Sequence, residues 1–188
     1  MLLRPSYPVL TDRLALRPFV VDDVEAMLAY RGRADVCRYL PFEPQDRDVL
    51  LERLAGPVLS RSDLTGEDQA LTLGVWRRDT GRLAGDVILF LRSEVDRRGE
   101  IGWVFDPEHG GQGLATEAAR AVLGLAFSGL RLHRVEARLV AENDRSAALC
   151  ERLGMQREAH FRQLERAADG WVDLVVYGLL AEEWSAAH

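Results

Sequence analysis

A glycine-rich turn between an apolar run and an amphipathic pattern constrains this chain most strongly. The apolar residues 101–105 have the length and composition of a strand. Apolar residues at helical spacing follow the turn, namely Leu114, Ala118, Val122 and Leu125. Three glycines fall within four positions between them, namely Gly110, Gly111 and Gly113. The stretch therefore predicts a strand, a tight loop and a helix in direct succession.

Such a loop can bind an anion through its main chain. Glycine adopts φ > 0 without a Cβ penalty and lets another molecule approach the backbone closely. The first N–H groups of the following helix have no intrahelical partner and lie at the positive end of its dipole. A phosphate or pyrophosphate is the natural ligand for such a site. The alternative is that the glycines only make a tight connection between two elements.

Three other motifs for phosphates or oxyanions do not fit this stretch. A Walker loop needs a lysine, and all 24 basic residues of the chain are arginine. A dinucleotide fingerprint needs a third glycine where Thr116 stands. His109-Gly110-Gly111 is similar to a hydrolase oxyanion loop, yet the chain contains no G-x-S-x-G elbow. The expected ligand is therefore a different phosphate compound.

Length and composition predict one domain of an ordinary globular type. A chain of 188 residues with 47% hydrophobic residues has room for a core, so we expect a single domain over residues 1–188. The net charge of −6 argues against nucleic-acid binding and permits a cationic acceptor. No apolar stretch suits export or membrane spanning, so we expect a cytoplasmic location. Two isolated cysteines and four scattered histidines predict no disulfide and no metal site.

The order of patterns predicts an α/β chain with an antiparallel meander before the glycine loop. A strand around Leu14 and Leu16 precedes a helix capped by Asp22 or Asp23. A second helix is expected over residues 45–59, and a hairpin joins strands at 70–76 and 83–91. After the loop and its helix we expect, in order, a strand at 134–140, a helix capped by Asn143 or Asp144 and ended by Gly154, and strands near 156–162 and 172–180.

Two blocks of the chain resemble the GCN5-related N-acetyltransferases, in the variant typical of their RimJ/RimL-like branch. Residues 107–118, P-E-H-G-G-Q-G-L-A-T-E-A, are similar to the acyl-coenzyme A pyrophosphate loop of that family. Residues 143–155, N-D-R-S-A-A-L-C-E-R-L-G-M, are similar to its N-x-x-S/A-x-x-L-x-x-K-x-G-F segment. Further segments near both ends resemble the opening strand and the close of the branch. The likeness covers nearly the whole chain.

The resemblance implies a fold, a reaction and a co-substrate. The fold would be a single α/β domain of α+β type, with a mixed, mostly antiparallel twisted sheet flanked by helices. The reaction would move the acetyl group of acetyl-coenzyme A (acetyl-CoA) directly onto a primary amine, with a protein or peptide N-terminal α-amine favoured. The alternatives are a small-molecule amine, such as a polyamine, an amino compound or an antibiotic, and a non-catalytic acyl-CoA binding module. A homodimer is compatible with the resemblance.

The resemblance also implies which residues hold acetyl-CoA. Main-chain N–H groups of the loop and the first helical turn would bind the pyrophosphate, with the Thr116 hydroxyl adding a bond; these residues are Gly111, Gln112, Gly113, Leu114, Ala115 and Thr116. The pantetheine arm would lie along the main chain of Trp103, Val104 and Phe105. Asn143 and Ser146 complete the expected site, although Asn143 also stands at a helix-cap position and Ser146 in a first helical turn.

Glu100 and Cys150 are the expected catalytic residues. The branch often carries a glutamate near the acceptor amine at the place of Glu100, which would act as general base; the alternative is a solvated strand-end charge. Cys150 stands where many relatives have a tyrosine, and its thiol would protonate the leaving thiolate; the alternative is a small core residue. At pH 7 a lysine-like amine is neutral about 0.04% of the time, which costs about 4.6 kcal/mol, against about 1 kcal/mol for an α-amine. An α-amine therefore needs less help from a base.

Overall fold

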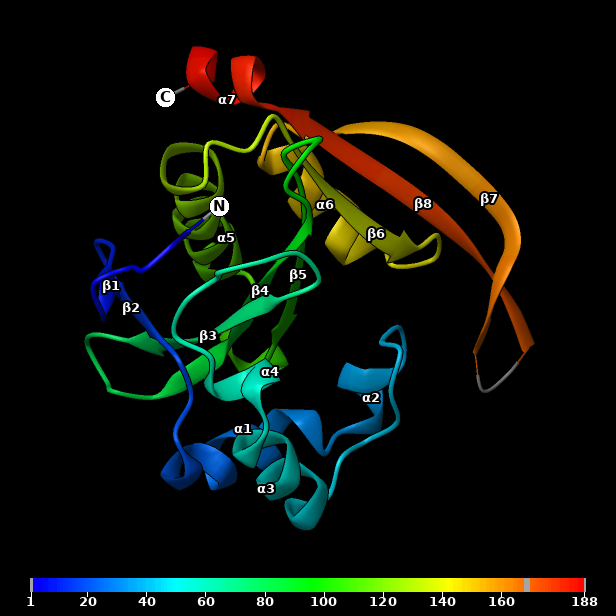
Figure 1. Ribbon diagram of the computed structural model, residues 1–188. Helices are drawn as coiled ribbons and strands as arrows, with labels where there is room; N and C mark the ends of the chain where they lie inside the picture. Colours follow the sequence, from blue (N-terminus) through cyan, green and yellow to red (C-terminus); the bar gives the residue numbers. More distant parts are fainter. Residues whose placement is uncertain (1, 168–169, 188) are drawn as a thin grey trace.

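The computed structural model describes residues 2–167 and 170–187 and contains one eight-stranded sheet (Figure 1). The strands are β1 (Val9–Leu10), β2 (Leu14–Arg17), β3 (Ala70–Arg77), β4 (Leu83–Ser93), β5 (Arg98–Phe105), β6 (Arg134–Val140), β7 (Gln156–Ala167) and β8 (Gly170–Leu180). Their order is β1-β2-β3-β4-β5-β6-β8-β7, and β5–β6 is the one parallel pair among the described strands. The predicted mixed, mostly antiparallel α/β fold is confirmed.

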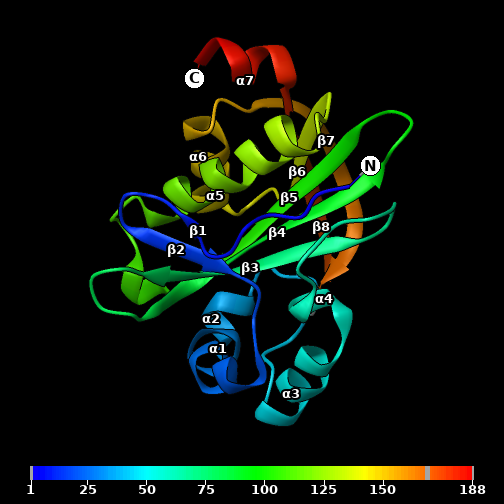
Figure 2. The ribbon, with the colours of Figure 1, turned by 60° about the vertical axis from the view of Figure 1, so that its left-hand side comes forward.

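Helices cover both faces of the sheet (Figure 2). One face carries α5 (Leu114–Gly124), extended by the π-helical turn η3 (Leu125–Gly129), and α6 (Asp144–Arg152). The other face carries α1 (Val24–Arg31), α2 (Ala34–Cys37), α3 (Arg47–Ala55) and α4 (Pro57–Ser60). Two 3-10 turns, η1 (Val21–Asp23) and η2 (Pro107–His109), precede α1 and the glycine loop, and α7 (Ala181–Ala187) follows β8. No helix among the described residues is long and apolar enough to cross a membrane.

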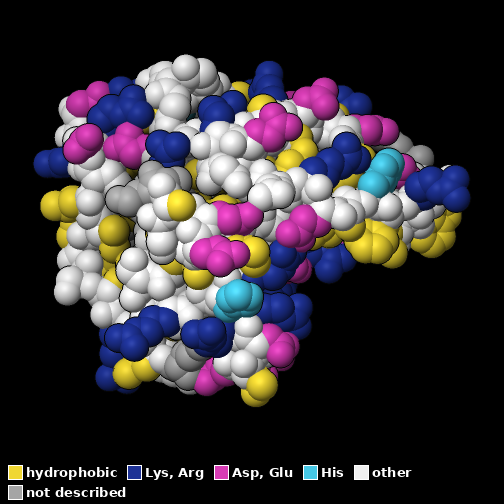
Figure 3. Space-filling view, turned by 90° about the horizontal axis from the view of Figure 1, so that it is seen from above, with side chains coloured by type: hydrophobic (Ala, Val, Ile, Leu, Met, Phe, Trp, Pro, Cys, Tyr) yellow, Lys and Arg dark blue, Asp and Glu magenta, His cyan; other side chains and the backbone are white. Residues whose placement is uncertain are grey.

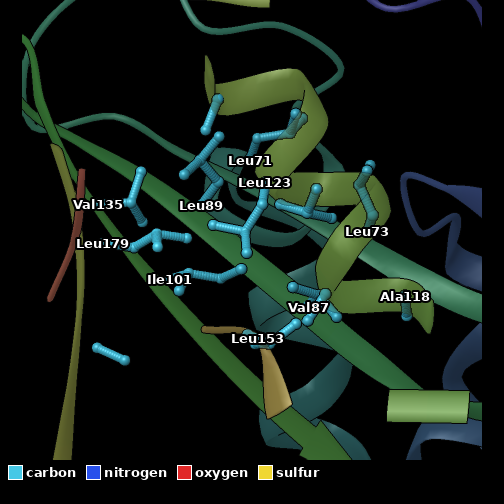
Figure 4. Close-up of a cluster of buried hydrophobic side chains, with 14 of the residues drawn as sticks. Leu71, Leu73, Val87, Leu89, Ile101, Ala118, Leu123, Val135, Leu153 and Leu179 are labelled. Carbon is cyan, nitrogen blue, oxygen red and sulfur yellow. The ribbon is translucent and has the colours of Figure 1, made fainter. Parts of the chain in front are cut away.

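The larger core lies between the sheet and the α5–α6 layer (Figure 4). Alternate residues of each strand point to this face, so that Leu89 of β4 and Ile101 of β5 share one core with Ala118 and Leu123 of α5. Leu114 and Val122 are also buried there, which confirms the apolar helical face expected from the sequence. Burial of this face fixes α5, and with it the loop at its N-terminus.

The smaller core holds α1 and α3 against the opposite face. Its fully buried side chains include Phe19, Met27 and Leu50, and Val104 of β5 points into it. A buried ion pair ties α1 to β4, with Arg31 Nη2 at 2.7 Å from Asp86 Oδ1. Because Val104 faces this side, the strand period of two also turns Glu100 toward the α1–α4 layer.

Strands β5 and β6 separate after a short joint. They pair at three rungs, Arg98↔Arg134, Gly99↔Val135 and Glu100↔Glu136. Beyond Glu100, β5 continues along β4 as far as Phe105, whereas β6 continues along β8. The sheet therefore opens between residues 101–105 and 137–140, a region called here the β5–β6 opening. On that side, alternate main-chain groups of β5 face no strand.

Two helical expectations needed correction. The helix predicted over residues 45–59 is broken into α3 and α4, because Gly56 is extended with ψ 163° and Pro57 starts a new helix. Asp23 occupies the N-cap position of α1 without a side-chain cap bond; its carboxylate instead accepts the Val20 N–H at 2.8 Å and pairs with Arg17. The four-residue α2 is too short to produce a periodic sequence pattern.

The β7–β8 hairpin projects from the body of the molecule (Figure 1). It is longer than the predicted strands at 156–162 and 172–180, and three large apolar residues on it are exposed, namely Phe161, Leu164 and Trp171. Figure 3 shows basic and acidic side chains interspersed over the face seen from above, with apolar side chains along the projecting hairpin. The surface charge is thus mixed on this face and does not form a single basic patch.

Candidate active site

The glycine loop has the backbone expected of an anion site. Gly111 and Gly113 have φ of +73° and +75°, and a Cβ at Gly111 would meet no atom within 4 Å, so the position demands glycine for its conformation and not for space. The first helical bond after the loop runs from the Glu117 N–H to the Gly113 carbonyl at 3.1 Å. The preceding N–H groups, up to Thr116, are therefore those that a helix leaves unpaired at its N-terminus.

The turn before the loop follows from its sequence. Asp106 is buried, and its carboxylate accepts the Glu108 N–H at 3.0 Å as the cap of η2, which Pro107 begins. The carboxylate of Glu108 lies 3.3 Å from Arg82. The exposed carboxylate of Glu108 thus has Arg82 as a cationic partner.

Glu117 and Arg13 anchor the loop to the first strands. Glu117 accepts the Thr11 hydroxyl at 2.6 Å and the Arg13 main-chain N–H at 2.9 Å, and it pairs with the Arg13 guanidinium. Burial raises the pKa of the Glu117 carboxyl, but these bonds outweigh burial and hold the pKa below its usual range. Arg13 also donates to the Gln112 carbonyl at 2.9 Å, so the opposite edge of that planar peptide, the Gly113 N–H, points away from Arg13.

Arginines surround the N-terminus of α5. A cavity of about 520 Å³ beside the loop is lined by Arg13, Gly113, Thr116, Arg120 and Arg152, together with two carboxylates. Arg152 Nε donates to the Thr116 hydroxyl at 3.3 Å, and Arg120 donates to the Arg152 carbonyl at 3.2 Å. On the other side of the loop Arg77 bonds the Gln112 side chain at 2.9 Å. Cations beside a helix N-terminus favour a phosphate-bearing ligand.

The sequence did not single out these arginines as site residues. Arg13 was visible in the opening segment and Arg152 in the second block, but neither carries a local signal for phosphate. Arg77 ends β3 and Arg120 lies on the exposed side of α5. The tertiary fold alone brings them to the loop.

The other expected cofactor residues meet at the β5–β6 opening. Trp103, Val104 and Phe105 form the end of β5 next to the loop. The Trp103 indole N–H donates to the Ser146 hydroxyl at 3.2 Å, which connects β5 to the first turn of α6. Asn143 caps α6 by accepting the Ser146 N–H at 3.1 Å. Its side-chain oxygen therefore serves the helix, and its amide N–H groups remain the part that could reach a ligand.

Glu100 stands at the closed end of the opening, on the last shared rung of β5 and β6. Its side chain is 18% exposed, and its carboxylate lies 3.0 Å from Arg92 Nε on β4. Its register partner on β6 is Glu136, so two acidic residues stand next to each other at this rung. A base at this point could receive a proton from a nucleophile held at the end of the opening.

Cys150 lies in the larger core, together with Leu149 and Leu153 of α6. Burial raises the pKa of its thiol to about 12. The structure does not bring Cys150 and Glu100 together on one face, since Glu100 points toward the α1–α4 layer. Both cysteines are free and buried, and the described residues contain no group of three or more potential metal ligands.

Comparison with known proteins agrees with this geometry. A family model described as an acetyltransferase (GNAT) domain matches residues 13–156. The uncharacterized N-acetyltransferase YnaD of Bacillus subtilis is 31% identical over 180 residues, which cover 94% of this chain and 99% of YnaD. Spermidine N(1)-acetyltransferase of Escherichia coli is 31% identical over 143 residues, 76% of this chain and 73% of that protein.

Comparison with a solved structure indicates the same family. A GNAT-family acetyltransferase from Bacillus anthracis aligns with a TM-score of 0.78 and 27% identity, over 97% of this chain and 99% of that one. The chain belongs to the GNAT family of N-acetyltransferases. It is an enzyme that depends on acetyl-CoA and acts on an amine.

Proposed function

We propose that this enzyme, as a single catalytic domain over residues 1–188, acetylates the α-amine of a protein or peptide in the manner of the RimJ/RimL-like branch. The observation that supports the proposal most is that the loop at the α5 N-terminus and Glu100 lie at opposite ends of the same open strand edge. Five residues of extended strand span about 17 Å. A long thioester with a phosphate group at its far end fits such an edge.

The described residues suit acetyl-CoA. Its pyrophosphate would meet the N–H groups from Gly111 to Thr116, where an added Cβ at Gly111 finds open space and arginines balance the charge. Its pantetheine amides would pair with free main-chain groups of Trp103 and Phe105, as a strand would. Asn143 and Ser146 would bound the other side. The thioester would then reach the rung of Glu100.

Direct transfer needs few groups from the protein. The amine nitrogen forms a bond to the carbonyl carbon as the carbon–sulfur bond breaks, its surplus proton passes to the Glu100 carboxylate, and the thiolate leaves. Proton donation from Cys150, with a pKa of about 12, to a thiolate with an ordinary pKa near 8.5 would be uphill by about 5 kcal/mol. We therefore assign thiolate protonation to water, and Cys150 to the core.

An α-amine suits this limited machinery, because its neutral form costs only about 1 kcal/mol at pH 7. A small-molecule polyamine is the second candidate. It is supported by the identity with the Escherichia coli spermidine enzyme and by the two neighbouring carboxylates, Glu100 and Glu136. A cytoplasmic location and a homodimer remain predictions.

The cofactor site is tested by calorimetric titration with acetyl-CoA and coenzyme A. Gly111→Asp should abolish micromolar-range binding, because it places a negative charge beside the expected pyrophosphate, and the two like charges repel. Gly111→Asn is the matched control: asparagine tolerates positive φ and has nearly the same shape without the charge, so it should retain most of the affinity. Wild-type binding of Gly111→Asp would exclude the loop as the pyrophosphate site.

The acceptor is tested by thiol release with peptides that begin with a free α-amine, with the same peptides N-terminally blocked, and with spermidine. The chain has no lysine, so acetylation of the enzyme's own side chains does not add to the thiol release. Release only with free α-amines supports the favoured acceptor, and release only with spermidine supports the second. Binding of acetyl-CoA without thiol release in the presence of any amine would instead support a non-catalytic acyl-CoA binding module.

A further inference from the structure

Arg92 gives Glu100 its one ion pair within the described chain. Arg92 lies at an irregular point of β4, where the register with β5 shifts between Leu91 and Ser93. Its Nε lies 3.0 Å from Glu100 Oε2. Its guanidinium carbon lies 4.2 Å from the centre of the Phe90 ring, and Phe90 is the register partner of Glu100.

The other charges around Glu100 are already engaged. Glu136, beside it on β6, lies 3.7 Å from Arg134, and Arg134 is also paired with Glu158 of β7. The Arg134–Glu158 pair lies over Gly178 of β8, where an added Cβ would collide with both of its side chains. Arg98, two residues before Glu100, pairs with Asp96 at 3.4 Å. Orientation of the Glu100 carboxylate therefore depends on Arg92.

We propose that Arg92 is a positioning residue for this enzyme: stacked on Phe90, it holds the Glu100 carboxylate at the closed end of the β5–β6 opening. The planar guanidinium can stack on the ring and donate to the carboxylate at once. Without Arg92, the carboxylate loses its one ion-pair partner among the described residues, so the base no longer has a fixed position at the end of the opening.

This inference rests on the proposed role of Glu100. Four variants test it against the wild type, namely Arg92→Leu, Arg92→Lys, Glu100→Gln and the double variant that combines Arg92→Leu with Glu100→Gln. Arg92→Leu should lower kcat by about tenfold to hundredfold and leave the dissociation constant of acetyl-CoA unchanged, because it disturbs the position of the base and not the cofactor site. Arg92→Lys should recover part of kcat, because an ammonium group can still pair with the carboxylate but lacks the planar stacking of arginine. Arg92→Leu in Glu100→Gln should cause little further loss, because the two residues act as a unit.

Arg98→Leu is the matched control, since it removes another arginine from the face of β5 that carries Glu100. It should change kcat by less than about twofold. Circular dichroism and thermal unfolding of each variant verify folding.

Three outcomes are distinguishable. No thiol release from the wild type with any amine overturns the proposed function and the role of Arg92 with it. Wild-type turnover in Glu100→Gln removes the base that Arg92 would position. Turnover that depends on Glu100 but keeps its rate in Arg92→Leu, or a loss that adds in full to that of Glu100→Gln, overturns the inference alone.

Discussion

At the residue scale, the site depends on side chains whose charge is set by a few neighbours. Glu117 is the clearest case, because it bonds Thr11 and Arg13 from the first strands while it stands in the first turn of the helix that follows the loop. An acidic residue at that place also complements the helix dipole. One carboxylate thus stabilises both the helix start and the contact that holds the loop.

Glu117→Gln should reduce the free energy of unfolding by about 1–2 kcal/mol at pH 7, since charged hydrogen bonds become neutral ones. The folded-state pKa lies below the reference value of 4.5. The contribution of ionised Glu117 is therefore complete above the unfolded-state pKa and is lost as pH falls through the folded-state pKa. Urea titrations should show the difference between wild type and variant shrinking below about pH 4.5. The exposed Glu142, changed to Gln, should show a much smaller effect at every pH; a constant gap for Glu117→Gln would contradict the argument.

At the element scale, α1 is tied to the sheet by a buried charge cluster. Asp86 and Arg31 are 1% and 4% exposed, and the Tyr30 hydroxyl also donates to Asp86. Burial, and next the charge of Asp86, raise the pKa of Tyr30 well above its usual value, so the phenol stays protonated and keeps donating. The cluster fixes α1 on the side of the sheet that Glu100 faces.

Asp86→Asn should lower the free energy of unfolding by about 3–5 kcal/mol, because it leaves Arg31 buried without its counter-ion. Denaturant unfolding measures the loss. Glu25→Gln provides the comparison at an exposed pair, where Glu25 lies 2.7 Å from Arg47, and should cost less than about 1 kcal/mol. The double variant Arg31→Met with Asp86→Leu should be more stable than Asp86→Asn. Equal stability of Asp86→Asn and wild type would show that the pair is not maintained in solution.

The elements that could be predicted from the sequence are those with a local signal. The glycine loop, α5, β6 and the Asn143 cap follow from spacing within about ten residues, and the structure has them close to the predicted bounds. The anchoring bond from Thr11 to Glu117 joins residues 106 positions apart, and no local pattern announces it. The three-rung limit of β5–β6 pairing was equally hidden, since the register of a parallel pair depends on how the whole crossover packs.

At the scale of the whole molecule, two half-sheets meet at one short joint, and acetyl-CoA would bridge them. The main-chain N–H of Asp106, just after β5, donates to the Ala84 carbonyl of β4 at 3.0 Å. Alternation along β5 then directs the N–H groups of Trp103 and Phe105 toward the opening, and those of Gly102 and Val104 toward β4.

Hydrogen exchange followed residue by residue should therefore show fast exchange at Trp103 and Phe105 and slow exchange at Gly102 and Val104 in the free enzyme. Saturating coenzyme A should slow the first pair and change the second pair little. Gly111→Asp should abolish the slowing. Protection of all four amides before coenzyme A is added would mean that the opening is closed in solution.

The short joint between β5 and β6 separates tight control from loose control along one edge. A rotation about it moves the end near Phe105 far more than the rung of Glu100, as the tip of a lever moves more than its pivot. The end of the opening that we propose for the nucleotide can therefore widen to admit and release a bulky ligand. The end that we propose for the reaction lies next to the joint and keeps its geometry through the same motion.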